Sequence, residues 1–172
     1  ISIILNGTDF GNRGPMSAHR DEWVFATTGN FRDSSMLNPI ISALTLLWEQ
    51  RQDFRWRVLG PVSEELQGEW VNLPFIQWLP GCDRDELHRE LQSADIFLFS
   101  FLNPNCPNSV IEAVALGIPV VGYNSGAMPE ICGFSPELLA PVGDQLIHVA
   151  GQLKPEALLE SLVRCLEEYE EF

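Results

Sequence analysis

The residues with the clearest chemical potential lie in two turn-rich segments, each of which follows an apolar run. The first segment reads NPNCPNS at residues 103–109, after the apolar residues 96–99, and Glu112 lies just beyond it. The second reads SGAMPE at residues 125–130, after the apolar residues 118–121. If a helix opens at the end of the first segment, its backbone N–H groups carry partial positive charge. This pattern therefore favours an anion-binding site.

The flanking residues predict a crossover unit that would position this site. The apolar runs at 96–99 and 118–121 are typical of parallel strands buried on both faces. Between them, apolar residues recur at helical spacing: Val110, Ile111, Val114 and Leu116. Gly117 is a natural helix stop. In open α/β sheets, ligands bind beyond the carboxyl ends of the strands, which is where both turns fall.

The rest of the chain repeats this alternation of strand and helix. Further strands are expected at residues 1–5, 23–27, 55–59 and 75–79, with a weak one at 137–141. Further helices are expected at residues 37–51, 63–67, 83–94 and 155–169. Repeated βα units over one core predict an α/β fold, a three-layer, Rossmann-like, doubly wound parallel sheet. With 172 residues, we expect residues 1–172 to form a single domain.

Composition and charge exclude several classes of protein. The hydrophobic content of 45% argues against disorder, and the net charge of −14 argues against a nucleic-acid partner. The four cysteines have no CxxC spacing, so we expect neither a metal site nor a disulfide framework. No apolar run is long enough to cross a bilayer, and residues 1–10 lack the features of a signal peptide. We therefore expect a cytoplasmic location and no membrane contact through this domain.

Common nucleotide and hydrolase motifs are absent from the sequence. GxGxxG, GxxxxGK[ST] and GxSxG do not occur where these sites need them, and the three histidines lie far apart. These absences argue against ordinary NAD binding, P-loop hydrolysis and a serine nucleophile.

Residues 105–121 resemble the donor-site signature of retaining GT-B glycosyltransferases. They read NCPNSVIEA followed by GIPVV, and the family form is EPxPNSxxEA followed by GxPVV. Three other segments also resemble family motifs: NGTD at 6–9 the hinge strand, GNFR at 29–32 the first donor loop, and SGAMPE at 125–130 the GGxPE turn. Together they resemble the carboxyl-terminal, donor-binding domain of the glycosyl transferases group 1. We expect the amino-terminal acceptor domain to be absent from this sequence and to be its partner.

The resemblance implies a hexosyltransferase reaction. The enzyme would move a sugar from a nucleotide-diphosphate sugar, such as a UDP-sugar, to an acceptor, with retention of configuration and no metal or other cofactor. Polysaccharide biosynthesis is the expected setting. Because catalysis in a two-domain enzyme needs the cleft to close and exclude water, we expect the isolated chain to turn over little.

The resemblance also assigns roles to residues on the predicted helix. Glu112 would accept hydrogen bonds from the ribose hydroxyls of the donor. The backbone N–H groups of Asn108, Ser109 and Val110 would face its diphosphate. An alternative from the residues alone is a capping box, in which Ser109 opens the helix and Glu112 satisfies the serine's own N–H group.

Other roles fall on the loops. Gly29 and Arg32 belong to the first donor loop, where Arg32 would be catalytic by stabilising charge on the leaving diphosphate. Gly126 would let the second turn approach the sugar closely. The alternative for Arg32 is an ordinary surface ion pair with Asp33 or another acidic residue. The alternative for Gly126 is the ordinary role of a glycine in a turn.

Two departures from the family pattern leave alternative functions open. Pro104 stands eight residues before Glu112, where the family has a glutamate that contacts the sugar. The lysine usual in the donor loop is also missing, with Ser34 and Ser35 in its region. These departures favour a catalytically degenerate interaction module as one alternative. A sugar-nucleotide epimerase, which uses a related two-domain architecture, is the second alternative.

Overall fold

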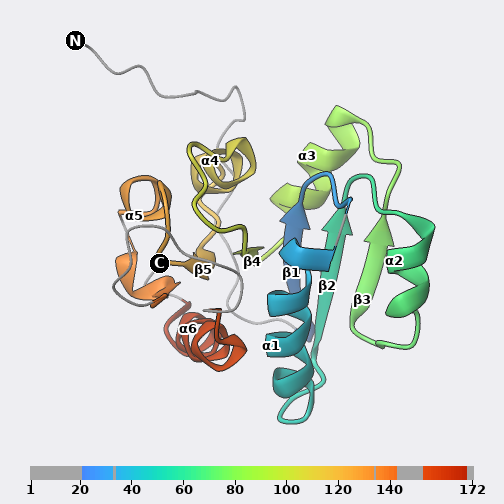
Figure 1. The fold of residues 1–172 in the computed structure, drawn as a ribbon, viewed down its shortest axis with the longest axis horizontal. Coiled ribbons are helices and arrows are strands. Elements are labelled where there is room, and N and C mark those ends of the chain that lie inside the picture. Colours follow the sequence, from blue (N-terminus) through green and yellow to red (C-terminus); the bar gives the residue numbers. More distant parts are fainter. Residues whose placement is uncertain (1–20, 33, 134, 143–152, 170–172) are drawn as a thin grey trace.

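We analysed a computed structural model of the chain, shown in Figure 1. The structure describes residues 21–32, 34–133, 135–142 and 153–169. The strand predicted at residues 1–5 and the hinge-like NGTD motif lie outside these residues.

One parallel sheet forms the centre of the described chain (Figure 1). Its order is β3-β2-β1-β4-β5-β6, and each neighbouring pair is parallel. The strands are β1 (Trp23–Thr28), β2 (Phe54–Leu59), β3 (Ile76–Leu79), β4 (Ile96–Phe99), β5 (Val120–Tyr123) and β6 (Leu139–Ala140). This topology confirms the predicted Rossmann-like fold.

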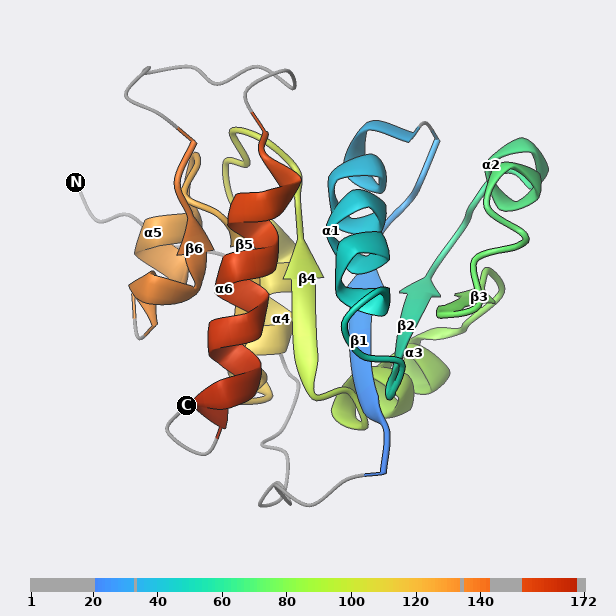
Figure 2. The ribbon, with the colours of Figure 1, turned by 90° about the horizontal axis from the view of Figure 1, so that it is seen from below.

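Helices cover both faces of the sheet. Figure 2 shows α1 and α6 side by side on one face, with α3 and α4 on the other. The α-helices are α1 (Asn38–Trp48), α2 (Glu64–Glu69), α3 (Arg84–Gln92), α4 (Asn108–Ala115), α5 (Met128–Ile131) and α6 (Pro155–Glu167). Two short 3₁₀ turns, η1 (Ser34–Met36) and η2 (Pro136–Leu138), complete the described elements. Neither α5 nor η1 was predicted, and η2 replaces the start of the weak strand expected at 137–141.

The sheet separates two hydrophobic clusters because successive strand residues point to opposite faces. In β4, Ile96 and Leu98 pack with α1 and α6, whereas Phe97 and Phe99 pack with α3, α4 and α5. All four side chains are buried. The continuous apolar run that predicted this strand therefore reflects burial on both faces.

Buried polar groups in the sheet are satisfied across the strands. The indole N–H of Trp56 donates to the hydroxyl of Thr27 at 2.8 Å, and this hydroxyl donates to the carbonyl oxygen of Leu98 at 2.9 Å. Thr27 and Trp56 are 1% and 0% exposed. This chain of hydrogen bonds links β2, β1 and β4 across the sheet.

Candidate functional site

The pairing of β1 with β4 creates a switch in the sheet topology. Phe25 lies opposite Ile96, and Ala26 opposite Phe97. The chain leaves β1 for α1 on one face and leaves β4 for α4 on the other (Figure 2). In open parallel sheets, this divergence opens a ligand-binding crevice at the carboxyl ends of the two strands. The loops at residues 29–37 and 100–107 therefore border the candidate site.

A hydrogen bond ties these two loops together. The hydroxyl of Ser100, directly after β4, donates to the carbonyl oxygen of Met36, which precedes α1. Ser100 is 3% exposed, so the contact lies beneath the surface of the crevice. The two loops thus have a fixed relation at their base.

The start of α4 faces this edge without a side-chain cap. Its N-cap residue is Pro107, whose side chain makes no capping hydrogen bond. The carbonyl oxygen of Pro107 accepts from the N–H groups of Val110 at 3.1 Å and Ile111 at 3.2 Å. Asn108 and Ser109 are the first two residues of the helix, where the helix dipole places partial positive charge.

The N–H group of Val110 donates to the carbonyl oxygen of Pro107, and its contact with a diphosphate stays a prediction. One reading of this turn needs correction. The alternative capping box is wrong because Ser109 lies inside the helix and Pro107 occupies the cap position. The sequence pattern misled because Asn108, not Ser109, begins the helix.

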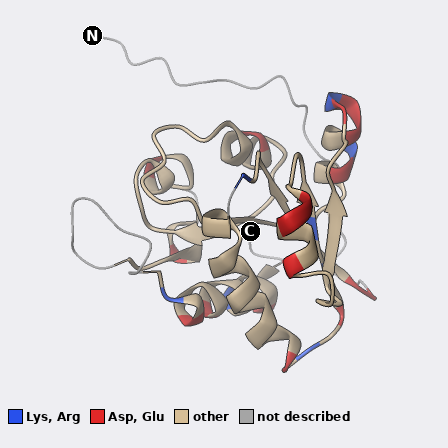
Figure 3. Cartoon of the chain, turned by 45° about the vertical axis from the view of Figure 1, so that its right-hand side comes forward, with Lys and Arg blue, Asp and Glu red and all other residues tan. Residues whose placement is uncertain are grey.

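Glu112 lies one turn into α4, on the same side as Asn108. Val110 and Ala113 form the buried side of the helix, whereas Glu112 is half-buried. Helical side chains lean towards the helix N-terminus, so this carboxylate leans towards the carboxyl edge of the sheet. Figure 3 shows charged residues gathered on α2 and α3 and sparse near α4 and α5. Glu112 is the one acidic residue of α4.

The turn after β5 is fastened to the loop after β4. The N–H group of Ala127 donates to the carbonyl oxygen of Pro104 at 2.8 Å. The N–H group of Asn103, a residue with φ of 51°, donates to the hydroxyl of Ser125 at 2.8 Å. A Cβ on Gly126 would lie 2.4 Å from the same Pro104 oxygen. Packing against Pro104 therefore requires a glycine here, whether or not a sugar approaches this turn.

The first donor-like loop lies on the other side of the crevice. Gly29 follows β1, and its N–H group donates to the carbonyl oxygen of Leu59 at 3.1 Å. Arg32 is exposed, and it forms no ion pair with any residue that the structure describes. Asp33, its alternative partner, lies outside the described residues. Arg32 and the start of α4 thus flank the switch between β1 and β4.

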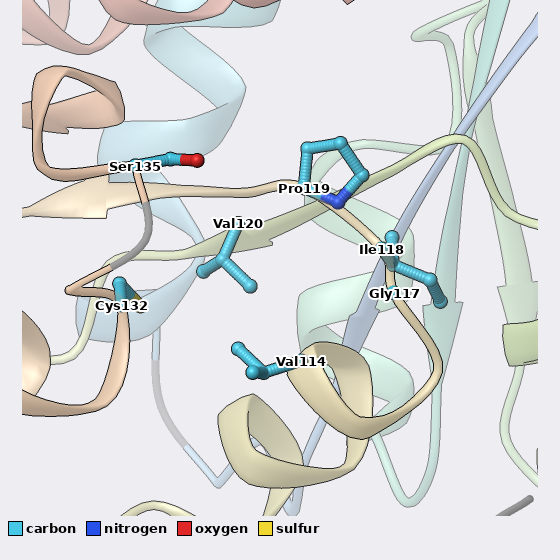
Figure 4. Close-up of a pocket in the computed structure, with 7 residues that line it drawn as sticks. All are labelled: Val114, Gly117, Ile118, Pro119, Val120, Cys132 and Ser135. Carbon is cyan, nitrogen blue, oxygen red and sulfur yellow. The ribbon is translucent and has the colours of Figure 1, made fainter. Parts of the chain in front are cut away.

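A pocket of about 200 Å³ lies away from this edge, at the amino end of β5 (Figure 4). Val114 and Val120 face each other across it, and Gly117, Pro119 and Cys132 also line it. Burial raises the pKa of the Cys132 thiol to about 11, which keeps it protonated and unreactive near neutral pH. Sequence patterns gave no signal for this pocket, because it forms between residues of separate elements.

Two searches of the described residues bear on other kinds of site. Their side chains contain no group of three or more His, Cys, Asp or Glu residues arranged to hold a metal ion. None of their helices has both the length and the apolar character needed to cross a bilayer.

Comparison with known families identifies the class of protein. The family model for glycosyl transferases group 1 matches residues 22–168. The chain belongs to this family. The match covers the sheet, the switch between β1 and β4, and the loops around it. No curated protein sequence matches this glycosyltransferase domain significantly.

Solved structures with the same fold include transferases and epimerases. The domain is similar to the pneumococcal O-GlcNAc transferase GtfA in complex with UDP and GlcNAc, with a TM-score of 0.69, 13% identity and coverage of 96% of this chain and 32% of that chain. It is also similar to a GtfA/B complex, with a TM-score of 0.68, 18% identity and coverage of 92% and 31%. A third similar structure is the UDP-GlcNAc 2-epimerase from Neisseria meningitidis bound to UDP-GlcNAc. Its TM-score is 0.61 and its identity 14%, with coverage of 90% of this chain and 38% of that chain.

These identities establish similarity of fold alone. The glycosyltransferase domain matches one half of a GT-B fold and spans about a third of the length of each of these chains, between 31% and 38%.

Proposed function

We propose that this glycosyltransferase domain binds the nucleotide-diphosphate sugar donor of a retaining transferase. The observation that carries the proposal is the pairing of β1 with β4, which puts the loop bearing Arg32 across one crevice from the start of α4. In the complete enzyme, an acceptor-binding domain would close over this crevice.

The diphosphate would lie at the first turn of α4. The helix dipole and the amides of Asn108 and Ser109 in the first turn favour negative charge there. This arrangement suits a protein whose net charge is −14, because it binds an anion with backbone groups and needs no large basic patch. The carboxylate of Glu112, one turn further along, would accept hydrogen bonds from two ribose hydroxyls.

Arg32 would supply the positive charge for catalysis. As the bond between the sugar and the diphosphate breaks, negative charge builds on the departing phosphate oxygens. A guanidinium group and the start of α4 would stabilise this charge from the two sides of the crevice. Gly29, half-exposed directly after β1, would let the backbone of the same loop approach the donor. This chemistry needs no metal ion.

A ligand-dependent thermal shift tests the binding half of the proposal. The pneumococcal transferase was solved with UDP, so UDP is the first nucleotide to test, followed by GDP and ADP. A nucleotide at one hundred times its dissociation constant should add about 2.7 kcal/mol of stability. For a chain of this size, that gain raises the melting temperature by several degrees.

Glu112→Gln should weaken the binding of the stabilising nucleotide by about tenfold or more, because a hydrogen bond to a charged acceptor is lost. Glu49→Gln is the matched control. Glu49 is exposed and lies at the carboxyl end of α1, whereas the amino end of α1 borders the crevice. If no nucleoside diphosphate stabilises the chain at millimolar concentration, the proposed function is wrong and the interaction-module alternative replaces it.

The complete protein tests the catalytic half. Arg32→Ala should reduce sugar transfer by 100-fold or more, in keeping with about 2.7 kcal/mol or more for one lost stabilising group. Anomeric analysis of the product by NMR checks retention. Release or rearrangement of the sugar without an acceptor would instead identify an epimerase.

A further inference from the structure

Phe101 is an exposed aromatic residue at the edge of the candidate site. It is 47% exposed and stands two residues beyond the end of β4. In the described chain, Val71 is the other large hydrophobic residue with high exposure, and it follows α2. Single exposed apolar residues are common on protein surfaces, so exposure alone does not indicate a binding role. The position of Phe101 beside the candidate site is what indicates one.

The loop that carries Phe101 is held on both sides of it. Ser100, the preceding residue, bonds to Met36 across the crevice. Leu102, the following residue, packs against the hydrophobic cluster beneath α1 and α6. Asn103 donates its N–H group to Ser125 at 2.8 Å. These contacts hold Phe101 at the surface between the loop after β1 and the turn after β5.

The proposed function gives the direction in which a donor would lie. A nucleotide sugar is linear, with the diphosphate between the ribose and the sugar. If Glu112 holds the ribose and the start of α4 holds the diphosphate, the donor continues past the start of the helix. The loop at residues 100–107 comes next, so the sugar would lie over Phe101 and its neighbours.

Pro104, at the centre of this loop, lies between Asn103 and the exposed Asn105. Pro104 is buried, has no side-chain donor or acceptor, and its carbonyl oxygen is engaged by Ala127. Phe101 is the exposed large apolar side chain of this loop. One face of a pyranose ring carries C–H groups, and burying it against an aromatic ring removes apolar surface from water.

We propose that Phe101 is a specificity-determining residue that packs against the C–H face of the donor's sugar. The substrate class is a nucleotide-linked pyranose with an uninterrupted C–H face. This inference rests on the proposed function. It adds a contact that would raise the affinity for the nucleotide sugar above the affinity for the nucleotide alone.

Calorimetric titration of the chain with UDP and with UDP-glucose tests the contact. GDP and GDP-glucose replace them if GDP is the nucleotide that stabilises the chain. Wild type should bind the nucleotide sugar more tightly than the nucleotide. Phe101→Ala should weaken the binding of the nucleotide sugar by about three- to tenfold and leave the affinity for the nucleotide unchanged. Phe101→Tyr should restore the wild-type ratio, and Val71→Ala should preserve it.

Each remaining outcome has a distinct meaning. If Phe101→Ala leaves the ratio of the two affinities unchanged, the sugar contact does not exist. If the variant weakens the binding of the nucleotide and of the nucleotide sugar equally, Phe101 contacts the nucleotide and the proposal is also wrong. If wild type binds no nucleotide at all, the proposed function fails first and this inference fails with it.

Discussion

A Cβ atom added to Gly126 would lie 2.4 Å from the carbonyl oxygen of Pro104, far inside van der Waals contact. The N–H group of the next residue, Ala127, donates to that oxygen at 2.8 Å. The turn after β5 therefore fits against the loop after β4 because residue 126 lacks a side chain. This junction keeps two of the loops at the carboxyl edge in a fixed arrangement.

Replacing Gly126 by alanine should destabilise the chain by more than conformation alone explains. Its φ of 56° costs about 1–2 kcal/mol for a residue with a Cβ, and the clash with Pro104 adds to this cost. Gly117→Ala is the matched control, because Gly117 has φ of 69° but open space around its Cβ position. Urea denaturation measures both losses. Equal losses for the two variants would contradict the close packing at Gly126.

Replacing Gly68 by alanine should stabilise the chain. Gly68 lies in α2, and a Cβ there would meet no atom within 4 Å. Alanine has less freedom than glycine in the unfolded chain, so we expect a gain of about 0.4–1 kcal/mol in the free energy of unfolding. Urea denaturation measures the gain, and a loss of stability would show that α2 does not form as described.

Replacing Tyr169 by phenylalanine should cost about 1–3 kcal/mol of stability. The Tyr169 hydroxyl donates towards the carbonyl oxygen of Asp95 at 3.1 Å and lies 3.3 Å from its carboxylate, in a site where Asp95 is fully buried. The edge contact of the ring with Trp23, at 4.8 Å between centroids, would remain in the variant. Thermal and urea unfolding measure the cost. A neutral substitution would mean that the hydroxyl contributes no net stability.

Raising the pH above about 9 should destabilise the chain through its buried thiols. Burial raises the pKa of Cys132 to about 11, and burial together with Glu168 raises that of Cys165 to about 12, from an ordinary value of 9.0. Between about pH 9 and 11 the folded chain therefore holds more protons than the unfolded chain, so the free energy of unfolding falls as pH rises. Each thiol contributes a slope of up to about 1.4 kcal/mol per pH unit.

Cys132→Ala should make this pH dependence shallower, because one of the two buried thiols is gone. Urea denaturation at several pH values between about 8 and 11 measures the slope. An unchanged slope in this variant would show that the Cys132 thiol ionises equally well in the folded and unfolded chain.

Sequence patterns predicted the elements that carry a continuous apolar run or a helical periodicity, and they missed those that carry neither. The run at 96–99 became β4 as expected, because burial on both faces demands continuous apolar residues. The strand expected at 118–121 begins later, at Val120, since Pro119 has no N–H group for a strand ladder. The four-residue helix α5 was missed because so short a segment shows no periodicity; its Met128 is fully buried against the rest of the fold.

The sequence by itself determined the order and type of the main elements, the parallel sheet that follows from them, and the motifs that resemble a donor site. Only the tertiary structure decided how the two turns fit together: the N–H group of Ala127 donates to the carbonyl oxygen of Pro104, and the space beside Gly126 is filled by Pro104. The physical reason is the distance along the sequence over which each feature acts. Periodicity reports local burial, whereas the crevice depends on β1 pairing with β4, as in the bond between Thr27 and Leu98, 71 residues apart.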